Sequence, residues 1–388
     1  MSDPASINVA LDGQLGSFRI DLEMEVPARG ITTLFGPSGC GKTTVLRSIA
    51  GLQHIPGRIS VGEDVWQDTN TGAFRPPHHR HVGYVFQEAS LFPHLSVRDN
   101  LLYGARRAKV VSPITLDDVV MLLGIGHLLE RATGALSGGE RQRVAVGRAL
   151  LSAPRILLMD EPLSALDRMT KNDILPYFER LHEELALPIV YVSHDITEVE
   201  RLADTLVLMR EGRILASGPL QELQTDPSLP LLASPEATVV LTGRVARIDE
   251  DYALTELEVA GGRLIVPGRH GAPGVSRRLR IAASDVSLAR TAPTDSTILN
   301  CLPARIVAIE GADTAPQASV ILVLGQGDGG DRIIATVTRK SLVGLGLTVG
   351  TAVFAQIKSV ALVAARSGHA APGDLAVDVG RGEHGAKK

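Results

Sequence analysis

The chain has 388 residues, 44% of them hydrophobic and 21% charged, which is typical of a globular protein with two or three domains. A net charge of −4 and an aromatic content of 3% argue against a nucleic-acid-binding protein. Two distant cysteines, Cys40 and Cys301, fit a reduced, intracellular protein better than a disulfide scaffold. The sequence shows neither an apolar run long enough to span a bilayer nor a signal peptide, so we expect a protein that stays in the cytoplasm.

The first part of the chain, residues 1–228, has the pattern of an α/β domain. Short apolar runs rich in β-branched residues predict buried strands, and the segments between them have helical spacing. Strands that alternate with helices predict a mostly parallel sheet covered on both faces. The strands are expected at 31–35, 81–86, 156–160, 189–193 and 205–209, and the main helices at 43–52, 139–152 and 171–186.

The pattern changes near residue 225. The segment TDPSLPLLASPEA contains three prolines and is typical of a linker. Short alternating segments separated by glycine-containing turns follow it, which predicts a small all-β barrel or sandwich. We expect a linker and first β segment at 229–290, a small OB-like β-barrel at 291–364 and a disordered, glycine-rich tail at 365–388.

Residues 36–43 read GPSGCGKT and match the phosphate-binding pattern G-x-x-x-x-G-K-[ST], with an expected strand before them and a helix after. The glycines let backbone N–H groups point at phosphate oxygens. We expect Lys42 to reach the β- and γ-phosphates and the Thr43 hydroxyl to bind Mg²⁺. The residues expected to contact the nucleotide here are Gly36, Pro37, Ser38, Gly39, Cys40, Gly41, Lys42, Thr43 and Thr44.

Two carboxylates, Asp160 and Glu161, follow the apolar run ILLM. They are expected to leave their strand at its carboxyl end, which is where open α/β sheets bind their ligands. Asp160 is expected to hold Mg²⁺ through water, and Glu161 to polarise the water that attacks the γ-phosphate. With the phosphate loop upstream, this pair predicts a nucleotide-hydrolysing site.

A second anion-binding element is predicted at residues 136–140, which read LSGGE. Ser137, Gly138 and Gly139 open a helix, and a helix N-terminus attracts anions. Ordinary kinases and GTPases need only one such phosphate-binding element. The economical explanation is a head-to-tail dimer in which each nucleotide lies between the phosphate loop of one chain and this helix start of the other.

These motifs resemble, in the same order, those of the ATP-binding subunits of ABC transporters over roughly residues 5–225. The resemblance identifies GPSGCGKTT as the Walker A loop, ILLMDEP as Walker B and LSGGE as the signature motif, in which Glu140 stands where glutamine is commoner. It implies an ABC-type P-loop ATPase core with a helical subdomain at about 88–152, followed by the small β domain.

The same resemblance implies roles for four further residues. Gln87 matches the Q-loop glutamine, which contacts Mg²⁺ and senses the transmembrane partner, and Asp167 lies in the matched D-loop. His194 matches the switch histidine that contacts the γ-phosphate. Phe18 lies in the segment of the family's adenine-stacking aromatic, with a shorter spacing to Gly36 than usual.

The ATPase segments look most like those of molybdate importers, and the C-terminal region resembles the molybdate-binding β domain of those proteins. The segments STILNCLPARIVAI and AQIKSVAL carry this second resemblance, which covers about 235–363. The anion loop of that domain usually reads Ser-Ala-Arg-Asn, whereas 297–300 read Thr-Ile-Leu-Asn, so the arginine is missing. The alternative is a β domain that only stabilises the dimer. The residues expected near a bound oxyanion are Thr297, Asn300, Thr338, Ser341 and Lys358.

The resemblance implies an ATP-hydrolysing, energy-coupling subunit of a molybdate or tungstate importer, with ATP and Mg²⁺ as cofactors. It would work as a homodimer at the cytoplasmic face of the inner membrane, with integral membrane permease subunits and, indirectly, a periplasmic or extracellular substrate-binding protein. An importer of sulfate, ferric iron or polyamine is the alternative within this class. A non-transport ABC ATPase is disfavoured because no coiled-coil insertion separates Lys42 from Leu136, and an anion-sensing regulator because all hydrolytic residues are present.

Overall fold

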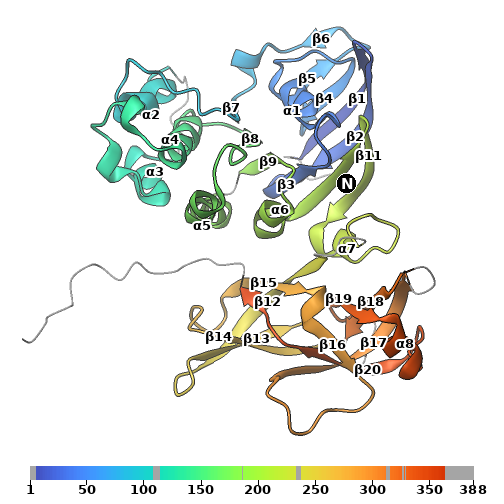
Figure 1. Ribbon diagram of the computed structural model, residues 1–388. Coiled ribbons are helices and arrows are strands. Elements are labelled where there is room, and N and C mark those ends of the chain that lie inside the picture. The colour runs from blue at the N-terminus through green and yellow to red at the C-terminus, as the bar shows by residue number, and fades with distance from the viewer. Residues whose placement is uncertain are drawn as a thin grey trace, which may run out of the picture.

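The computed structural model describes residues 6–107, 114–185, 187–232, 237–311, 315–325, 327 and 329–362. The expected tail at 365–388 and residues 233–236 of the expected linker lie outside the described residues. Figure 1 shows an α/β region before α7 (Leu220–Gln224) and an all-β region after it. The predicted fold class, an α/β core followed by a small all-β domain, is therefore confirmed. Among the helices of the described ranges, none combines the length and the apolar character that a membrane crossing requires.

The central sheet has six strands in the order β11-β10-β3-β9-β8-β7, parallel except for the β10–β11 hairpin. All the strands expected from buried apolar runs are present in it. Every residue of β8 and β9 is buried, as a parallel sheet covered on both faces requires. The bounds are β3 (Gly30–Phe35), β7 (Val82–Val85), β8 (Ile156–Asp160), β9 (Pro188–Ser193), β10 (Thr205–Arg210) and β11 (Arg213–Pro219).

One face of the central sheet is covered by α1 (Lys42–Ala50) and a five-stranded antiparallel sheet, order β2-β1-β4-β5-β6, that the sequence analysis did not predict. Ile7 and Val9 of this sheet, Leu46 of α1 and Leu158 of β8 belong to one buried cluster. The phosphate-loop helix is thus fixed between two sheets. The strands are β1 (Ile7–Leu15), β2 (Phe18–Val26), β4 (Gly57–Val61), β5 (Asp64–Asp68) and β6 (Ala73–Phe74).

The other face is covered by helices, and some of these form a separate helical group within the predicted range 88–152 (Figure 1). Three helices of this group begin at a side-chain N-cap, supplied by Ser96, Thr115 and Ser137. The helices on this face are α2 (Val97–Ala105), α3 (Leu116–Leu123), α4 (Gly138–Leu150), α5 (Arg168–Glu184) and α6 (Ile196–Leu202). Short 3₁₀ turns lie between α3 and α4, at Gly126–Leu128 and Thr133–Ala135, and before β7, at Pro77–His79.

The C-terminal region consists of two five-stranded antiparallel sheets, β14-β13-β12-β15-β21 and β16-β20-β17-β18-β19, that share one core. β16 pairs with β20, and β21 pairs with β15. Each sheet therefore contains strands from both sides of residue 290. The expected division at 290/291 therefore runs through a single folded unit. The strands are β12 (Thr238–Asp249), β13 (Leu254–Val259), β14 (Gly262–Pro267), β15 (Ser276–Ala282), β16 (Val286–Ala289), β17 (Asn300–Glu310), β18 (Gln317–Leu324), β19 (Arg332–Thr338), β20 (Ala352–Ile357) and β21 (Ala361–Leu362), with α8 at Arg339–Gly344 and a 3₁₀ turn at Ala283–Asp285.

Charged contacts join the two regions at α6. Glu200, which is 1% exposed, accepts hydrogen bonds from Arg280 Nε at 2.6 Å and from the Thr238 hydroxyl. Arg278 of β15 pairs with Asp204, just after α6. The β domain is therefore anchored to the helix that follows β9.

Candidate functional site

The phosphate loop joins β3 to α1 at the carboxyl edge of the central sheet. Gly36 passes so close to β10 that a Cβ there would lie 2.2 Å from the Met209 carbonyl oxygen, so only glycine fits. Gly41 has φ 105° and precedes the first turn of α1, and a Cβ there would lie 3.1 Å from the Phe18 ring. This loop geometry keeps side chains away from the helix N-terminus, as an anion-binding loop requires.

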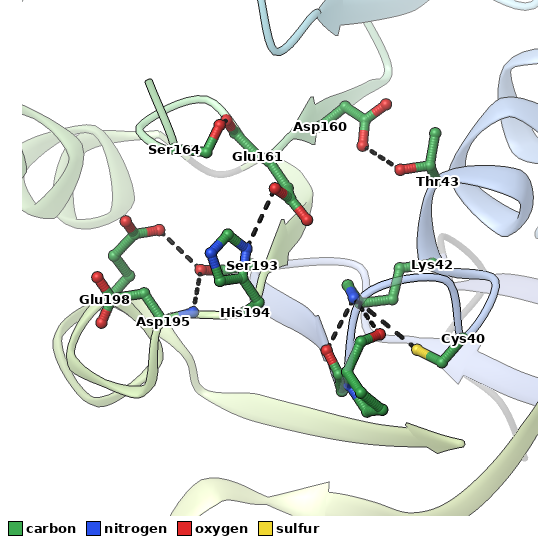
Figure 2. Close-up of polar contacts among 12 residues, drawn as sticks. Cys40, Lys42, Thr43, Asp160, Glu161, Ser164, Ser193, His194, Asp195 and Glu198 are labelled. Carbon is green, nitrogen blue, oxygen red and sulfur yellow. Dashed lines mark hydrogen bonds and ion pairs between the residues drawn. The ribbon is translucent and has the colours of Figure 1, made fainter. Parts of the chain in front are cut away.

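Lys42 is buried, and its ammonium group lies inside the phosphate loop (Figure 2). Its Nζ donates to the carbonyl oxygens of Gly36 at 2.8 Å and Pro37 at 3.0 Å, and lies 3.8 Å from the Cys40 sulfur. A cation fixed here, next to backbone N–H groups at a helix start, creates a positive potential suited to phosphate oxygens.

Asp160 ends β8 with its carboxylate turned toward α1 (Figure 2). Thr43 Oγ1 donates to Asp160 Oδ1 at 2.7 Å, and the Tyr84 hydroxyl donates to Oδ2 at 3.1 Å. Burial, followed by the negative charge of Asp160, raises the pKa of Tyr84, so the phenol keeps the proton that it donates. The expected pair of Thr43 and Asp160 is brought together, whereas Tyr84 was not singled out from the sequence.

Glu161 points toward His194, with Oε2 lying 3.1 Å from the His194 Nδ1 (Figure 2). The backbone of Glu161 has φ 44°, in the left-handed region that residues with a side chain adopt at a cost. Two hydrogen bonds hold it there, from the Glu161 N–H to the Val192 oxygen at 3.1 Å and from the Ser164 hydroxyl to the Glu161 oxygen at 2.9 Å. Maintained strain of this kind is typical of a functional site.

A buried carboxylate, Glu198, supports the turn that carries His194. Its Oε2 accepts from the Ser193 and Tyr191 hydroxyls, both at 2.8 Å, and its Oε1 accepts from Lys171 at 2.7 Å. Burial alone would lower the pKa of Lys171, but hydrogen bonds to two carboxylates hold it above its ordinary value. This network was not predicted from the sequence, because its members come from α5, β9 and α6.

The signature residues lie at the start of α4. Ser137 caps the helix by accepting from the Glu140 N–H at 3.3 Å, and Glu140 Oε2 accepts from the Ser137 N–H at 2.7 Å. That second hydrogen bond is the main cause of the lowered pKa of Glu140. A Cβ at Gly138 would lie 2.8 Å from the end of the Leu166 side chain, and one at Gly139 would lie 2.7 Å from the end of Ile174, so either substitution would require that neighbour to shift. In Figure 1 α4 lies apart from α1, so one chain does not bring the two helices that carry the anion-binding elements together.

Two other expected residues lie around the site. Asp167 caps α5, where its Oδ1 accepts from the Met169 and Thr170 N–H groups at 3.0 Å, and the Thr170 hydroxyl is the main cause of its lowered pKa. Gln87 follows β7 and is exposed. Because Asp167 caps the first turn of α5, it fixes where this helix starts after the turn that follows Glu161.

The five residues expected near an oxyanion are not assembled by one chain. Asn300 starts β17 and pairs with Ile357, next to Lys358 and close in sequence to the exposed Thr297. Thr338 pairs with Gln317 at the other end of the same sheet. Within one chain the five residues therefore lie at two ends of the sheet, and their role near an oxyanion stays a prediction.

Asn300 and Thr338 also have structural hydrogen bonds of their own. The buried amide of Asn300 accepts from the Ile265 N–H at 2.7 Å and donates to the Ile265 oxygen at 2.9 Å, which joins the start of β17 to the edge strand β14. Thr338 caps α8 by accepting from the Ser341 N–H at 3.1 Å, and the two hydroxyls lie 2.8 Å apart. Sequence similarity could not reveal that the Asn300 amide is already satisfied.

Comparison with known proteins identifies the family. The family model described as ABC transporter matches residues 20–164, and the TOBE domain model matches residues 296–364. A molybdenum import ATP-binding protein ModC of Rhodopseudomonas palustris is 57% identical over 94% of this chain and 98% of its own. The chain belongs to the ATP-binding subunits of ABC transporters. It is therefore an ABC-type ATPase, and its α/β region binds ATP.

A relative from another organism agrees with this assignment. The molybdenum import ATP-binding protein ModC of Rhodobacter capsulatus is 54% identical over 92% of this chain and 98% of its own. Among solved structures, cbiO1 of Clostridium perfringens aligns with 56% of this ABC subunit and 89% of its own chain, at 26% identity and a TM-score of 0.48.

Proposed function

We propose that this chain is the energy-coupling ATPase of an importer for molybdate and tungstate, bound to the cytoplasmic face of the inner membrane. The observation that carries this proposal is the 57% identity, over 94% of the chain, to a protein named for molybdenum import. The similarity includes the β domain as well as the ATPase region. It is therefore not limited to the part that ABC ATPases for every substrate share.

Mg²⁺ is the proposed metal cofactor, and the residues at the site fit it. Thr43 and Asp160 offer a hydroxyl and a carboxylate whose oxygens lie 2.7 Å apart, and Mg²⁺ prefers such oxygen ligands. Within the described residues there is no cluster of three or more His, Cys, Asp or Glu, which suits an ion held largely by phosphates and water. When bound with ATP, the ion would neutralise charge on the β- and γ-phosphates.

Glu161 is the proposed general base of hydrolysis. It would orient the attacking water and accept its proton while the water oxygen bonds to the γ-phosphorus and the bond to the bridging oxygen of ADP breaks. His194, whose Nδ1 lies 3.1 Å from the Glu161 carboxylate, would orient that carboxylate and contact the γ-phosphate. Lys42 and the loop N–H groups would stabilise the phosphate charge.

The complete site is proposed to need two copies of the chain. Within one chain α4 lies apart from α1 (Figure 1), so Ser137 of one copy would meet the nucleotide on the other. For the β domain we propose a role in holding the two copies together. Within the nucleotide site, Phe18 remains the proposed adenine contact. Gln87 remains a proposed Mg²⁺ contact.

Ser137→Arg is expected to abolish ATP-dependent pairing of the subunits, because an arginine at this helix start would occupy the place of the opposing γ-phosphate. Ser137→Arg and its controls are made in the Glu161→Gln chain, which should keep its ATP bound. Size-exclusion chromatography in the presence of ATP then measures the fraction of dimer. Ser137→Ala controls for the lost helix cap, worth about 1 kcal/mol, and Met121→Arg, at a position 73% exposed on α3, controls for the added charge. Wild-type dimer formation and turnover in Ser137→Arg would reject the head-to-tail site.

The segment after β7 is the proposed contact for the permease. Phe92 lies against the Tyr103 ring at 4.2 Å and below the Arg148 guanidinium at 5.1 Å. The Asn100 side chain fixes its backbone, accepting from the Phe92 N–H at 2.8 Å and donating to its oxygen at 3.1 Å. A partly exposed aromatic held this firmly suits a docking surface for an apolar segment of the permease.

Phe92→Asp is expected to leave basal ATP hydrolysis unchanged and to remove its stimulation by the permease, because a carboxylate replaces the apolar contact. The ATPase rate with and without permease in proteoliposomes measures this. Phe92→Leu, which keeps an apolar side chain, is expected to retain most of the stimulation. Equal stimulation of Phe92→Asp and wild type would reject this segment as the docking surface.

The substrate is tested with the subunit reconstituted with its permease and substrate-binding protein. We expect ATP hydrolysis to rise with molybdate and with tungstate, and to stay at its basal rate with sulfate, ferric iron or a polyamine. Stimulation by one of the last three alone would replace the proposed substrate while leaving the ATPase assignment in place.

A further inference from the structure

Tyr84 lies on β7, the edge strand of the central sheet, next to the strand that ends in Asp160. In the parallel register Tyr84 pairs with Leu158, two residues before Asp160. Because side chains alternate along a strand, those of Tyr84 and Asp160 lie on the same face of the sheet. Two residues span about 6.6 Å along a strand, a distance that the long tyrosine side chain can bridge.

The Asp160 carboxylate is held from two sides. Thr43 of α1 donates to Oδ1 at 2.7 Å, and Tyr84 donates to Oδ2 at 3.1 Å. Asp160 is only 5% exposed, so few water molecules can replace either donor. A carboxylate with a fixed donor on each oxygen cannot rotate freely, and it keeps further lone pairs for another ligand.

Neighbouring side chains also fix Tyr84 itself. Its ring lies 4.4 Å from the Phe86 ring and packs against the buried cluster that contains Leu46 of α1. The phenol has a single proton, and it donates that proton to Asp160. The orientation of the Asp160 carboxylate is therefore set by a side chain that is itself ordered before any nucleotide binds.

We propose that Tyr84 is a positioning residue that holds the Asp160 carboxylate in the orientation needed to bind the divalent metal ion. This inference rests on the proposed function, because the metal-binding role of Asp160 is part of it. Residues that hold a metal ligand in its orientation contribute strongly to metal binding. Their loss typically lowers the affinity for the metal by about 10- to 100-fold. Tyr84 would act on the metal only through Asp160.

Tyr84→Phe tests this proposal, because it removes one hydroxyl and keeps the ring that packs on Phe86. With Mn²⁺ as a spectroscopic substitute for Mg²⁺ and a non-hydrolysable ATP analogue, electron paramagnetic resonance measures metal binding to the full-length chain. We expect the dissociation constant of Mn²⁺ to rise about 10-fold. Binding of a fluorescent ATP analogue in excess EDTA is expected to stay within about twofold of wild type, since the phosphate loop is unchanged.

Two further variants make the outcomes distinct. Tyr252→Phe, at a residue 76% exposed in the β domain, is the matched control and should bind Mn²⁺ like wild type. Asp160→Asn should lose Mn²⁺ binding; if it does not, the proposed metal-binding role of Asp160 fails, and the role of Tyr84 with it. If Asp160→Asn loses Mn²⁺ but Tyr84→Phe binds it normally, only the role of Tyr84 is overturned. An equal loss of metal-free nucleotide binding in Tyr84→Phe would also overturn it, because that indicates a general structural effect.

Discussion

Glu161→Gln is expected to bind ATP like wild type and to hydrolyse it about 10²–10⁴-fold more slowly, the range for loss of a general base. The amide has nearly the same shape as the carboxylate and can still contact His194, 3.1 Å away in the wild type. It cannot accept a proton from the attacking water. The phosphate loop and Lys42 are unchanged, so ATP should remain bound and hold two copies together.

Single-turnover hydrolysis and nucleotide binding by fluorescence separate these two effects. Glu211→Gln is a suitable control, because Glu211 also has a positive φ, 50°, but its side chain is 85% exposed at a hairpin between β10 and β11. We expect the control to hydrolyse ATP at the wild-type rate. A Glu161→Gln variant with near-normal turnover would show that another group activates the water.

Arg280→Met is expected to lower the stability of the junction between the β domain and α6 by about 3 kcal/mol. Glu200 is 1% exposed, and without Arg280 its charge would keep, among the described residues, the Thr238 hydroxyl as its side-chain hydrogen-bond partner. Because α6 follows His194 by one residue, the loss should also increase amide hydrogen exchange in Ile196–Leu202. Urea unfolding and hydrogen exchange with mass spectrometry measure the two effects.

The control for this second prediction is Arg269→Met. Arg269 pairs with Glu250 at 2.6 Å, but both side chains are more than half exposed, so its loss should cost less than about 1 kcal/mol. The double variant Glu200→Met/Arg280→Met should regain most of the stability, since an apolar pair leaves no buried charge. Equal stability of Arg280→Met and Arg269→Met would contradict the anchoring role of the junction.

The sequence alone predicted the central sheet because its strands are continuous apolar runs, such as ILLMD of β8, which is buried at every position. It missed the N-terminal antiparallel sheet. That signal is weaker, because the buried and exposed residues of β1 alternate only over Ile7–Leu11 before the turn at Gly16. The alternation on both sides of a short turn would have predicted this hairpin.

Site residues in short motifs were easier to predict than those whose partners are distant in sequence. Thr43 and Asp160 were expected to share a ligand because each belongs to a motif, and they are in contact at 2.7 Å. Glu198 and Glu200 have no such motif, and their partners come from other strands and helices. Asn300 shows the opposite case, in which similarity indicated a ligand contact but both of its amide atoms bind the backbone of Ile265.

Uptake of labelled molybdate into proteoliposomes tests the central claim most directly. The vesicles would contain the permease with this chain and ATP on the inside, and the substrate-binding protein with labelled molybdate on the outside. We predict accumulation that requires ATP, is competed by tungstate but not by sulfate, and is lost when Glu161→Gln replaces the wild-type chain. Molybdate uptake that continues without ATP or with Glu161→Gln, or no molybdate uptake by vesicles that accumulate sulfate, would contradict it.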